Sequence, residues 1–336
     1  MKHSVVHIVD DAAWGGVNRL LAGLEESRGT TRDRHQILRV PRGTRVAPAI
    51  EADVIVSHMA VCWKNLPFFT SLRASHPATP LVHVEHSYSE RFVALKVQDR
   101  QRFNDLMRLT YALFDRIVAV SGPQAEWLSR RRACQPDQLV TIPSCVDLRP
   151  FRAIAGRRPT GPFTIGAIGR FHEQKGFDIL VEAFVKADLP DTRLLLVGDG
   201  PEKPWLQVKA AAHPGVIFVD STPEPAQVMA LCHAVAMPSR WEPYGLVALE
   251  AMAAERPVFC SMADGLRQHI RNGAMEVHEN SVEGWVQFLR LHAHGGTRAS
   301  AAGSYAAAHA EHAFTEAWNW LVQTLLVNVP ATQMAA

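Results

Sequence analysis

The chain has 336 residues, of which 47% are hydrophobic and 20% are charged, which is the balance of a soluble globular protein. This length suits two domains of roughly 150 residues each. No run approaches the roughly 20 unbroken apolar residues of a membrane span, and no secretory signal is expected at the N-terminus. The five cysteines are scattered without a CxxC pair, which argues against a disulfide framework or a zinc knuckle and predicts a cytoplasmic protein.

The net charge of +2 hides a difference between the two halves. Residues 1–158 hold 23 Lys and Arg against 15 Asp and Glu, a net +8, which leaves −6 for the remainder. A basic first half suits an anionic acceptor or a peripheral contact with an anionic membrane, and it also suits ordinary solvated arginine. The inner face of the plasma membrane is therefore an alternative location, and no nucleic-acid partner is expected.

Short strand-like runs alternate with helical stretches through the first half of the chain. Helical amphipathic segments are expected at 91–114 and 123–132. Six runs have the composition of strands, namely 3–9, 35–40, 52–58, 80–86, 116–122 and 138–144. This alternation predicts a parallel sheet with helices on both faces.

A Pro/Gly/Arg-rich segment without apolar periodicity, residues 149–162, predicts an interdomain linker. Beyond it the alternation restarts, with a helical tail from 281 onward. The expected elements are strands at 163–169, 192–198, 216–220, 234–239, 256–261 and, weakly, 274–279, and helices at 176–187, 202–212, 224–232 and 245–254. The predicted fold class is α/β, with two Rossmann-like doubly wound domains facing a central cleft, so functional side chains should follow strand ends.

Two strand ends in the second half carry candidate phosphate or nucleotide contacts. In AIGRFHEQKGFDIL, Arg170 and Lys175 lie between a strand and a helix N-terminus, where cations and free N–H groups can hold phosphate. A solvated loop explains this segment as well. In LLLVGDGPEK, Gly198 permits close approach of a ligand, or simply makes a βα turn. The GxxxxGK[ST] and GxGxxG motifs are absent, which disfavours a P-loop protein or a dehydrogenase.

The segment PSRWEPYGLVALEAMA places two carboxylates eight residues apart. Pro243 and Gly245 predict a loop followed by a helix, with Glu242 in the loop and Glu250 inside the helix. About 12 Å of helical rise separates them, too far for two carboxylates that flank one glycosidic bond. They could hold hydroxyls at opposite ends of an extended ligand, or be a helix-dipole residue and a surface residue. The N–H groups of Gly245, Leu246 and Val247 would be free for ligand oxygens.

The first half offers two further strand ends. Gly15 and Gly16, before a helix, would let the backbone approach a diphosphate, although a plain turn also explains them. His86 follows a strand, directly after Glu85, where it could donate a hydrogen bond or a proton at a reacting centre. His83 and His86 form an HxxH pair, but no third metal ligand is suggested.

As an ordered set these segments resemble the retaining glycosyltransferases of the GT-B fold, specifically family 4. GRFHEQKG, LLLVGDGP and PSRWEPYGLVALEAMAAERPV occur in family order and spacing, and the last contains the family's Glu-x7-Glu motif. Upstream, WGGVNR, VEHS, VAVSGPQAEWL and IPSCVDLRPF resemble the Gly-Gly loop, the histidine strand end and the linker entry of the family. The resemblance implies an N-terminal acceptor-binding domain over 1–150 and a C-terminal donor-binding domain over 151–313. A last helix, about 314–328, would pack back on the N-terminal domain.

The resemblance also implies roles for the candidate residues. Arg170 and Lys175 would neutralise the donor diphosphate, Glu250 would bind the ribose, and Glu242 would bind the transferred sugar. The backbone of residues 245–247 would lie beside that sugar. In the first half, Gly16 would touch the phosphates and His86 would lie near the anomeric carbon.

The implied activity is metal-independent transfer with retention, from a nucleotide-diphosphate sugar to a hydroxyl of a glycan or lipid-linked acceptor. Fixed cations would stabilise the leaving diphosphate, since no Asp-x-Asp is present, and neither a cofactor nor a metal is expected. Bacterial exopolysaccharide or lipopolysaccharide biosynthesis is the expected pathway. The alternatives are a catalytically silent GT-B scaffold that binds a partner glycosyltransferase, a sugar-nucleotide epimerase, or a phosphorylase.

The sequence departs from the family pattern at three places. Ser144 and Cys145 replace the usual Asn-Gly of the linker entry, and Gln268 occupies a position that is usually Glu. The segment after residue 272 is shortened and lacks the usual G-L-L-V-P strand. These departures affect the expected contacts with the donor sugar and leave the expected fold unchanged.

Overall fold

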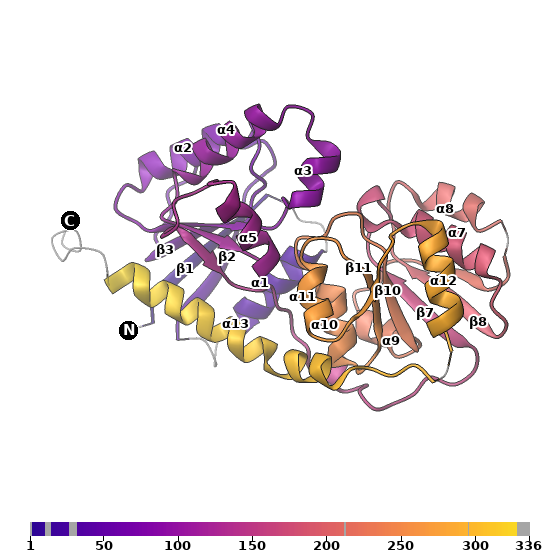
Figure 1. The fold of residues 1–336 in the computed structure, drawn as a ribbon. Helices are drawn as coiled ribbons and strands as arrows, with labels where there is room; N and C mark the ends of the chain where they lie inside the picture. The colour runs from indigo at the N-terminus through magenta and orange to yellow at the C-terminus, as the bar shows by residue number, and fades with distance from the viewer. Residues whose placement is uncertain (1, 11–14, 27–31, 212, 295, 328–336) are drawn as a thin grey trace. The chain divides into compact units, whose positions relative to one another are not determined.

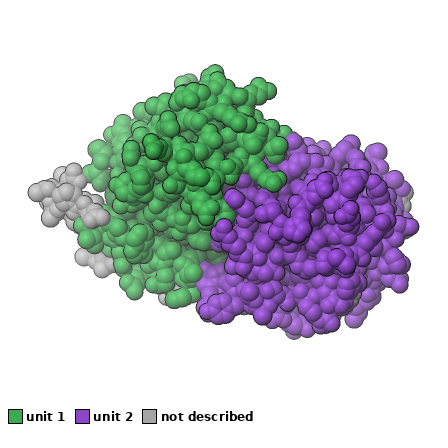
Figure 2. Space-filling view, viewed as in Figure 1, with its two compact units in different colours: residues 1–146, 311–336 green, residues 147–310 purple. Residues whose placement is uncertain are grey.

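The computed structural model describes residues 2–10, 15–26, 32–211, 213–294 and 296–327. The chain divides into two compact units (Figure 2), which are residues 1–146 with 311–336 (unit 1) and residues 147–310 (unit 2). Each unit contains a parallel six-stranded sheet with helices on both faces (Figure 1). The predicted class of two Rossmann-like α/β domains is confirmed.

The sheet of unit 1 contains the six strands that the sequence predicts. They are β1 (Ser4–Val9), β2 (Arg34–Arg39), β3 (Val54–Ser57), β4 (Leu81–Glu85), β5 (Arg116–Ala119) and β6 (Leu139–Thr141). All neighbours are parallel and the order is β2-β1-β3-β4-β5-β6. The order reverses between β1 and β3, so the carboxyl ends of these strands form the point where ligands of such sheets bind.

Helices cover both faces of the sheet of unit 1 (Figure 1). They are α1 (Gly16–Glu26), α2 (Leu66–Ser75), α3 (Glu90–Lys96), α4 (Arg100–Tyr111), α5 (Gly122–Arg130) and the part of α13 (Ala301–Val327) from residue 311 onward. Phe69 of α2 and Met107 of α4 are buried in the core of one face. Trp318 of α13 packs on the opposite face, with its ring 5.7 Å from that of His7.

The helical segment predicted at 91–114 is two helices, α3 and α4. The side chain of Asp99 accepts a hydrogen bond from the backbone N–H of Arg102 at 2.9 Å and caps a new helix there. Such a cap satisfies an N–H group that has no partner within the helix. The prediction of one continuous stretch was therefore wrong at residues 97–99.

The sheet of unit 2 also contains its six predicted strands, including the weak last one. They are β7 (Phe163–Ile168), β8 (Thr192–Val197), β9 (Val216–Val219), β10 (Ala234–Met237), β11 (Val258–Ser261) and β12 (Met275–Val277). The order is β12-β11-β10-β7-β8-β9, with parallel neighbours. The order reverses between β7 and β10, which places the ligand-binding point of this sheet at the ends of those two strands.

The helices of unit 2 likewise form two layers. Those described are α6 (Arg149–Arg152), the 3-10 turn η1 (Glu173–Lys175), α7 (Phe177–Ala187), α8 (Lys203–Lys209), α9 (Pro225–Met229), α10 (Leu246–Ala253), α11 (Leu266–Arg271), α12 (Val282–His292) and the first part of α13. Helices α7, α8 and α12 share one core with Phe184, Leu206 and Trp285. Helices α6, α9, α10 and α11 belong to the other layer (Figure 1).

The segment predicted as a linker, residues 149–162, packs within unit 2. Phe151 of α6 is 1% exposed, and Arg256 donates a hydrogen bond to the backbone oxygen of Arg157 at 2.6 Å. The tail beyond residue 281 is interrupted between α12 and α13, where the sequence has the helix-disfavouring pair Gly295-Gly296. Residues 212 and 328, the expected ends of two helices, lie outside the described residues. No described helix has both the length and the apolar character that crossing a bilayer requires.

Candidate active site

The ends of β7 and β10 bring two predicted site residues together. Lys175, in the loop after β7, and Glu242, in the loop after β10, form an ion pair with Nζ and Oε2 2.5 Å apart. The side chains are 21% and 9% exposed, respectively. The solvated-loop interpretation of Lys175 is therefore wrong, and a shielded cation and a carboxylate lie side by side at the switch point of this sheet.

Hydrogen bonds from its own loop and from the loop after β11 hold Glu242 in place. The hydroxyl of Ser239 lies 3.3 Å from Oε2 of Glu242. The backbone N–H of Glu242 donates to the carboxylate of Asp264 at 3.2 Å, and its backbone oxygen accepts from the N–H of Gly265 at 2.8 Å. Because Asp264 and Gly265 follow β11, three adjacent strand ends fix the position of this one carboxylate.

A second ion pair joins the loop after β10 to the first turn of α7. Arg240 donates to both carboxylate oxygens of Asp178, at 2.7 and 2.5 Å, and to the backbone oxygen of Glu173 at 2.9 Å. Its pKa is raised because Asp178 bonds and attracts the guanidinium. Two parallel bonds fix both distance and orientation. This pair was not predicted from the sequence, where the available signal was an Arg two residues before Glu242.

Helix α10 presents its N-terminus between the two predicted glutamates. It begins after Gly245, which has a φ of +97° and provides no side-chain cap, so the N–H groups of Leu246 and Val247 have no acceptor within the helix. Glu242 lies in the preceding loop and Glu250 lies in the helix, as predicted. Glu250 is 0% exposed, so its interpretation as a surface residue is wrong.

Arg170 follows β7 and Gly198 follows β8, which is the neighbouring strand. Arg170 is exposed and forms no hydrogen bond or ion pair with any residue that the structure describes. The backbone of Gly198 approaches that of Gly169 so closely that a Cβ atom at residue 198 would lie 2.0 Å from the Gly169 oxygen. The close contact at Gly198 is therefore with the loop after β7, next to Arg170, and this contact requires a glycine there.

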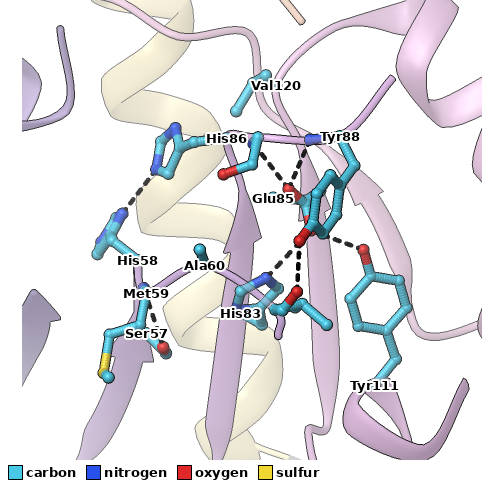
Figure 3. A network of polar contacts seen from close by, with 12 residues as sticks. Ser57, His58, Met59, Ala60, His83, Glu85, His86, Tyr88, Tyr111 and Val120 are labelled. Atoms are coloured by element: carbon cyan, nitrogen blue, oxygen red, sulfur yellow. Dashed lines mark hydrogen bonds and ion pairs between the residues drawn. The ribbon is translucent and has the colours of Figure 1, made fainter. Parts of the chain in front are cut away.

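In unit 1, the glycines and His86 follow different strands. Gly15 is exposed and Gly16 begins α1; the backbone oxygen of Gly15 accepts from the N–H of Arg19 at 3.0 Å. His86 is half-buried after β4, and its Nε2 lies 2.8 Å from Nδ1 of His58 (Figure 3). Burial lowers the pKa of His86 to about 4, with His83 acting in the same direction and Glu85 against it. His86 is therefore neutral at pH 7.

The carboxylate of Glu85 organises the loop that carries His86 (Figure 3). It accepts hydrogen bonds from the backbone N–H groups of Ser87, at 2.7 Å, and Tyr88, at 3.0 Å, and from the hydroxyl of Tyr111 at 2.8 Å. Burial alone would raise its pKa, but His83 and the two N–H groups hold the pKa below its usual value. A buried, charged Glu85 thus fixes the turn on either side of His86.

His83 and His86 belong to different surroundings although they form an HxxH pair in the sequence. The ring of His83 lies 6.1 Å from that of Phe69 and 5.2 Å from that of Phe114, inside the core, and its Nε2 lies 3.5 Å from Glu85. His86 contacts His58 instead. Within the described ranges, no three His, Cys, Asp or Glu side chains are grouped to hold a metal ion.

We expect acid to destabilise unit 1. Burial lowers the pKa values of His35 and His86 to about 4 and those of His7 and His58 well below the ordinary value of 6.5. The unfolded chain binds these protons near pH 6.5 and the folded chain does not, so the free energy of unfolding falls as pH drops from 6.5 towards 4. Urea unfolding at about pH 7.5 and about pH 5 measures the change. An equal midpoint at both values would contradict it.

Two family models match the chain, one in each unit. The model described as "Glycosyltransferase Family 4" matches residues 22–149, and "Glycosyl transferases group 1" matches residues 162–290. With the paired Rossmann-like sheets, these matches define the class of glycosyltransferases with the GT-B fold. The chain belongs to glycosyltransferase family 4.

Curated relatives match most of the chain at moderate identity. The chain is 26% identical over 232 residues to the glycogen synthase of Mycobacterium tuberculosis, covering 66% of this chain and 53% of that protein. It is 29% identical over 280 residues to the D-inositol 3-phosphate glycosyltransferase of Actinosynnema mirum, covering 74% and 66%, respectively. The chain thus spans between about half and two thirds of the length of these relatives.

Among solved structures, the fold is similar to that of Anabaena Alr3699/HepE in complex with UDP-glucose. The TM-score is 0.69, and the match covers 99% of this chain and 100% of that one at 17% sequence identity. At this identity, the similarity establishes the GT-B fold alone.

Proposed function

We propose that the protein is a retaining glycosyltransferase that moves a sugar from a nucleotide-diphosphate donor to a hydroxyl of a glycan or glycolipid acceptor. The observation that carries this proposal is the Lys175–Glu242 ion pair at the switch point of unit 2. A sugar diphosphate offers anionic oxygens and hydroxyl groups close together, so its site needs cations and hydrogen-bond acceptors side by side.

The donor is bound by unit 2. Lys175 has three N–H donors, so it can keep its bond to Glu242 and still bind a phosphate oxygen. Arg170 supplies a second cation, and the N-terminus of α10 supplies N–H groups and the positive end of its dipole. The second carboxylate oxygen of Glu242 accepts from a sugar hydroxyl, and Glu250 accepts from the ribose.

The chemical step is a substitution on one face of the sugar. The bond between the anomeric carbon and the diphosphate oxygen breaks while the acceptor oxygen bonds to the same face, which retains configuration. The departing phosphate oxygen takes the acceptor proton. Arg170 and Lys175 stabilise the charge that develops on the leaving group, so the proposed reaction needs no divalent cation. His86 of unit 1 is a proposed proton-transfer residue.

The proposed acceptor is anionic, as in bacterial exopolysaccharide or lipopolysaccharide assembly. The support is the basic first half of the chain, with a net charge of +8 over residues 1–158. The N-terminal α/β unit would bind this acceptor, and a peripheral contact with an anionic membrane would supply it.

A donor panel tests the proposal. Titration calorimetry with UDP, GDP and ADP should show one nucleotide that binds, and the HepE–UDP-glucose complex makes UDP the first candidate. The matching nucleotide sugar should then transfer its sugar with retained anomeric configuration by NMR, equally well with and without EDTA. Absence of binding by all three nucleotides would favour the silent scaffold. Epimerised donor without acceptor, or a requirement for phosphate, would favour an epimerase or a phosphorylase.

A further inference from the structure

Four histidines of unit 1 form a continuous hydrogen-bonded chain, which we call the histidine chain (His35, His7, His58 and His86). Nδ1 of His35 lies 2.9 Å from Nε2 of His7, and Nδ1 of His7 lies 2.9 Å from Nε2 of His58. Nδ1 of His58 lies 2.8 Å from Nε2 of His86 (Figure 3). Each contact joins Nδ1 of one ring to Nε2 of the next, so the direction never reverses.

The sheet topology explains how the chain forms. The four residues lie in or directly after the neighbouring strands β2, β1, β3 and β4. His7 is level with Ile37, two residues after His35, and with Val56, two residues before His58. Between β3 and β4, Ser57 is level with His83, so His86 lies two residues beyond the residue that is level with His58. Because side chains two residues apart share a face, the four rings run diagonally from the edge strand β2 to the carboxyl end of β4.

The interior of the histidine chain is shielded from water. His7 is fully buried, His35 and His58 are buried, and Trp318 of α13 packs edge-on against the ring of His7. Desolvation keeps the pKa values of these three rings below the ordinary value, so each is neutral at pH 7. A neutral imidazole has one N–H and one bare nitrogen. Each ring can therefore donate to one neighbour and accept from the other.

We infer that His35, His7 and His58 form a proton relay that couples the protonation of Nδ1 of His86 to that of Nε2 of His35. When Nδ1 of His86 takes a proton, its Nε2 gives one to Nδ1 of His58. Nε2 of His58 then gives one to Nδ1 of His7, and Nε2 of His7 gives one to Nδ1 of His35. Nε2 of His35, whose residue is 5% exposed, releases one to solvent. One proton enters, one leaves, and every ring ends neutral in its other tautomer.

The role of the relay in catalysis, but not the relay itself, rests on the proposed function. Glycosyl transfer to a hydroxyl releases one proton overall. The departing phosphate takes this proton first, and the relay then gives it an exit through Nδ1 of His86 that does not depend on water. His35, His7 and His58 touch no substrate in the proposed relay. They are positioning residues, which decide whether the outer nitrogen of His86 donates or accepts a hydrogen bond.

The experiment reads the ring nitrogens directly, in the full-length protein without substrate. Long-range 1H–15N NMR of 15N-histidine-labelled protein shows which of its two nitrogens is protonated in each ring. Replacing His7 by Leu interrupts the relay in the middle. His35→Gln changes only its far end and remains informative if H7L fails to fold. Both variants should change the tautomer of His86. The matched control is His76→Gln, a buried histidine of unit 1 outside the chain, which should leave His86 unchanged.

Activity provides an independent second measurement. H7L and H35Q should lower kcat about 10²-fold with KM unchanged, since proton transfer contributes at least that much where it is used. Identical His86 signals in wild type, H7L and H35Q would overturn the relay whatever the activity. Coupled histidine signals in a protein that transfers no sugar would support the relay and refute the proposed function. A changed KM with unchanged kcat would overturn its catalytic role.

Discussion

Replacing Lys175 with Ala should lower kcat/KM for glycosyl transfer by about 10²- to 10³-fold, the usual effect of removing one group that stabilises developing negative charge. The ammonium lies 2.5 Å from Glu242 and is largely shielded from water, so no mobile ion can replace it at the same place. The loss should fall mainly on kcat, because the leaving diphosphate gains charge only as the bond breaks. Initial rates over a range of donor concentration separate kcat from KM.

Lys175→Ala also leaves the carboxylate of Glu242 without its cation. The resulting loss of stability must be distinguished from the loss of catalysis. Removing one member of a shielded ion pair can cost up to about 3 kcal/mol of stability. The double variant K175M/E242Q removes both charges and should recover most of that stability. It should remain inactive, because neither the diphosphate cation nor the sugar-binding carboxylate is present. Thermal unfolding and transfer assays on the two variants separate the effects.

A surface ion pair in the same unit provides the matched control. Lys186 and Glu283 are 2.8 Å apart with side chains 57% and 65% exposed. Exposed pairs contribute about 0–1 kcal/mol, so Lys186→Ala should have wild-type activity and nearly wild-type stability. If K175A were as active as K186A, the assignment of Lys175 to the leaving group would be refuted.

Local rules indicated from the sequence which loops and helix carry the candidate residues. Pro243 and Gly245 indicate a loop and a helix start, which places Glu242 before the helix and Glu250 within it. Parallel strands bring their carboxyl ends to one edge, so functional side chains were expected to follow strand ends. The ion pair between Lys175 and Glu242 follows from that rule and from the strand order.

Contacts between segments far apart in the sequence could not be predicted from local rules. The pairing of Arg240 with Asp178 depends on how the loop after β10 lies against the first turn of α7, which local sequence rules do not determine. The histidine chain depends on strand order and register, since its members are 28 and 51 residues apart. The available signal was a histidine in or just after each of four strands, with a second one, His83, inside β4. It acquires meaning only when the order β2-β1-β3-β4 is known.

Replacing Gly198 with Ala should destabilise unit 2 and disrupt donor binding. The φ angle of Gly198 is +148°, and a Cβ atom there would lie 2.0 Å from the backbone oxygen of Gly169 and 3.0 Å from its carbon. Backbone strain and overpacking each cost about 1–3 kcal/mol, so a loss of roughly 3 kcal/mol or more is expected. Relief of the clash must displace Gly169 and with it Arg170, so the Kd for the nucleotide should rise.

Gly161→Ala separates the steric effect from the backbone effect. Gly161 also lies in unit 2 and has a φ of +88°, but no atom lies within 4 Å of its added Cβ. That variant should lose only the conformational part, about 1 kcal/mol, and bind nucleotide normally. Chemical denaturation gives the stabilities and calorimetry gives the Kd values. Equal losses in G161A and G198A would show that the contact with Gly169 is unimportant, and normal nucleotide binding by G198A would remove Arg170 from the donor site.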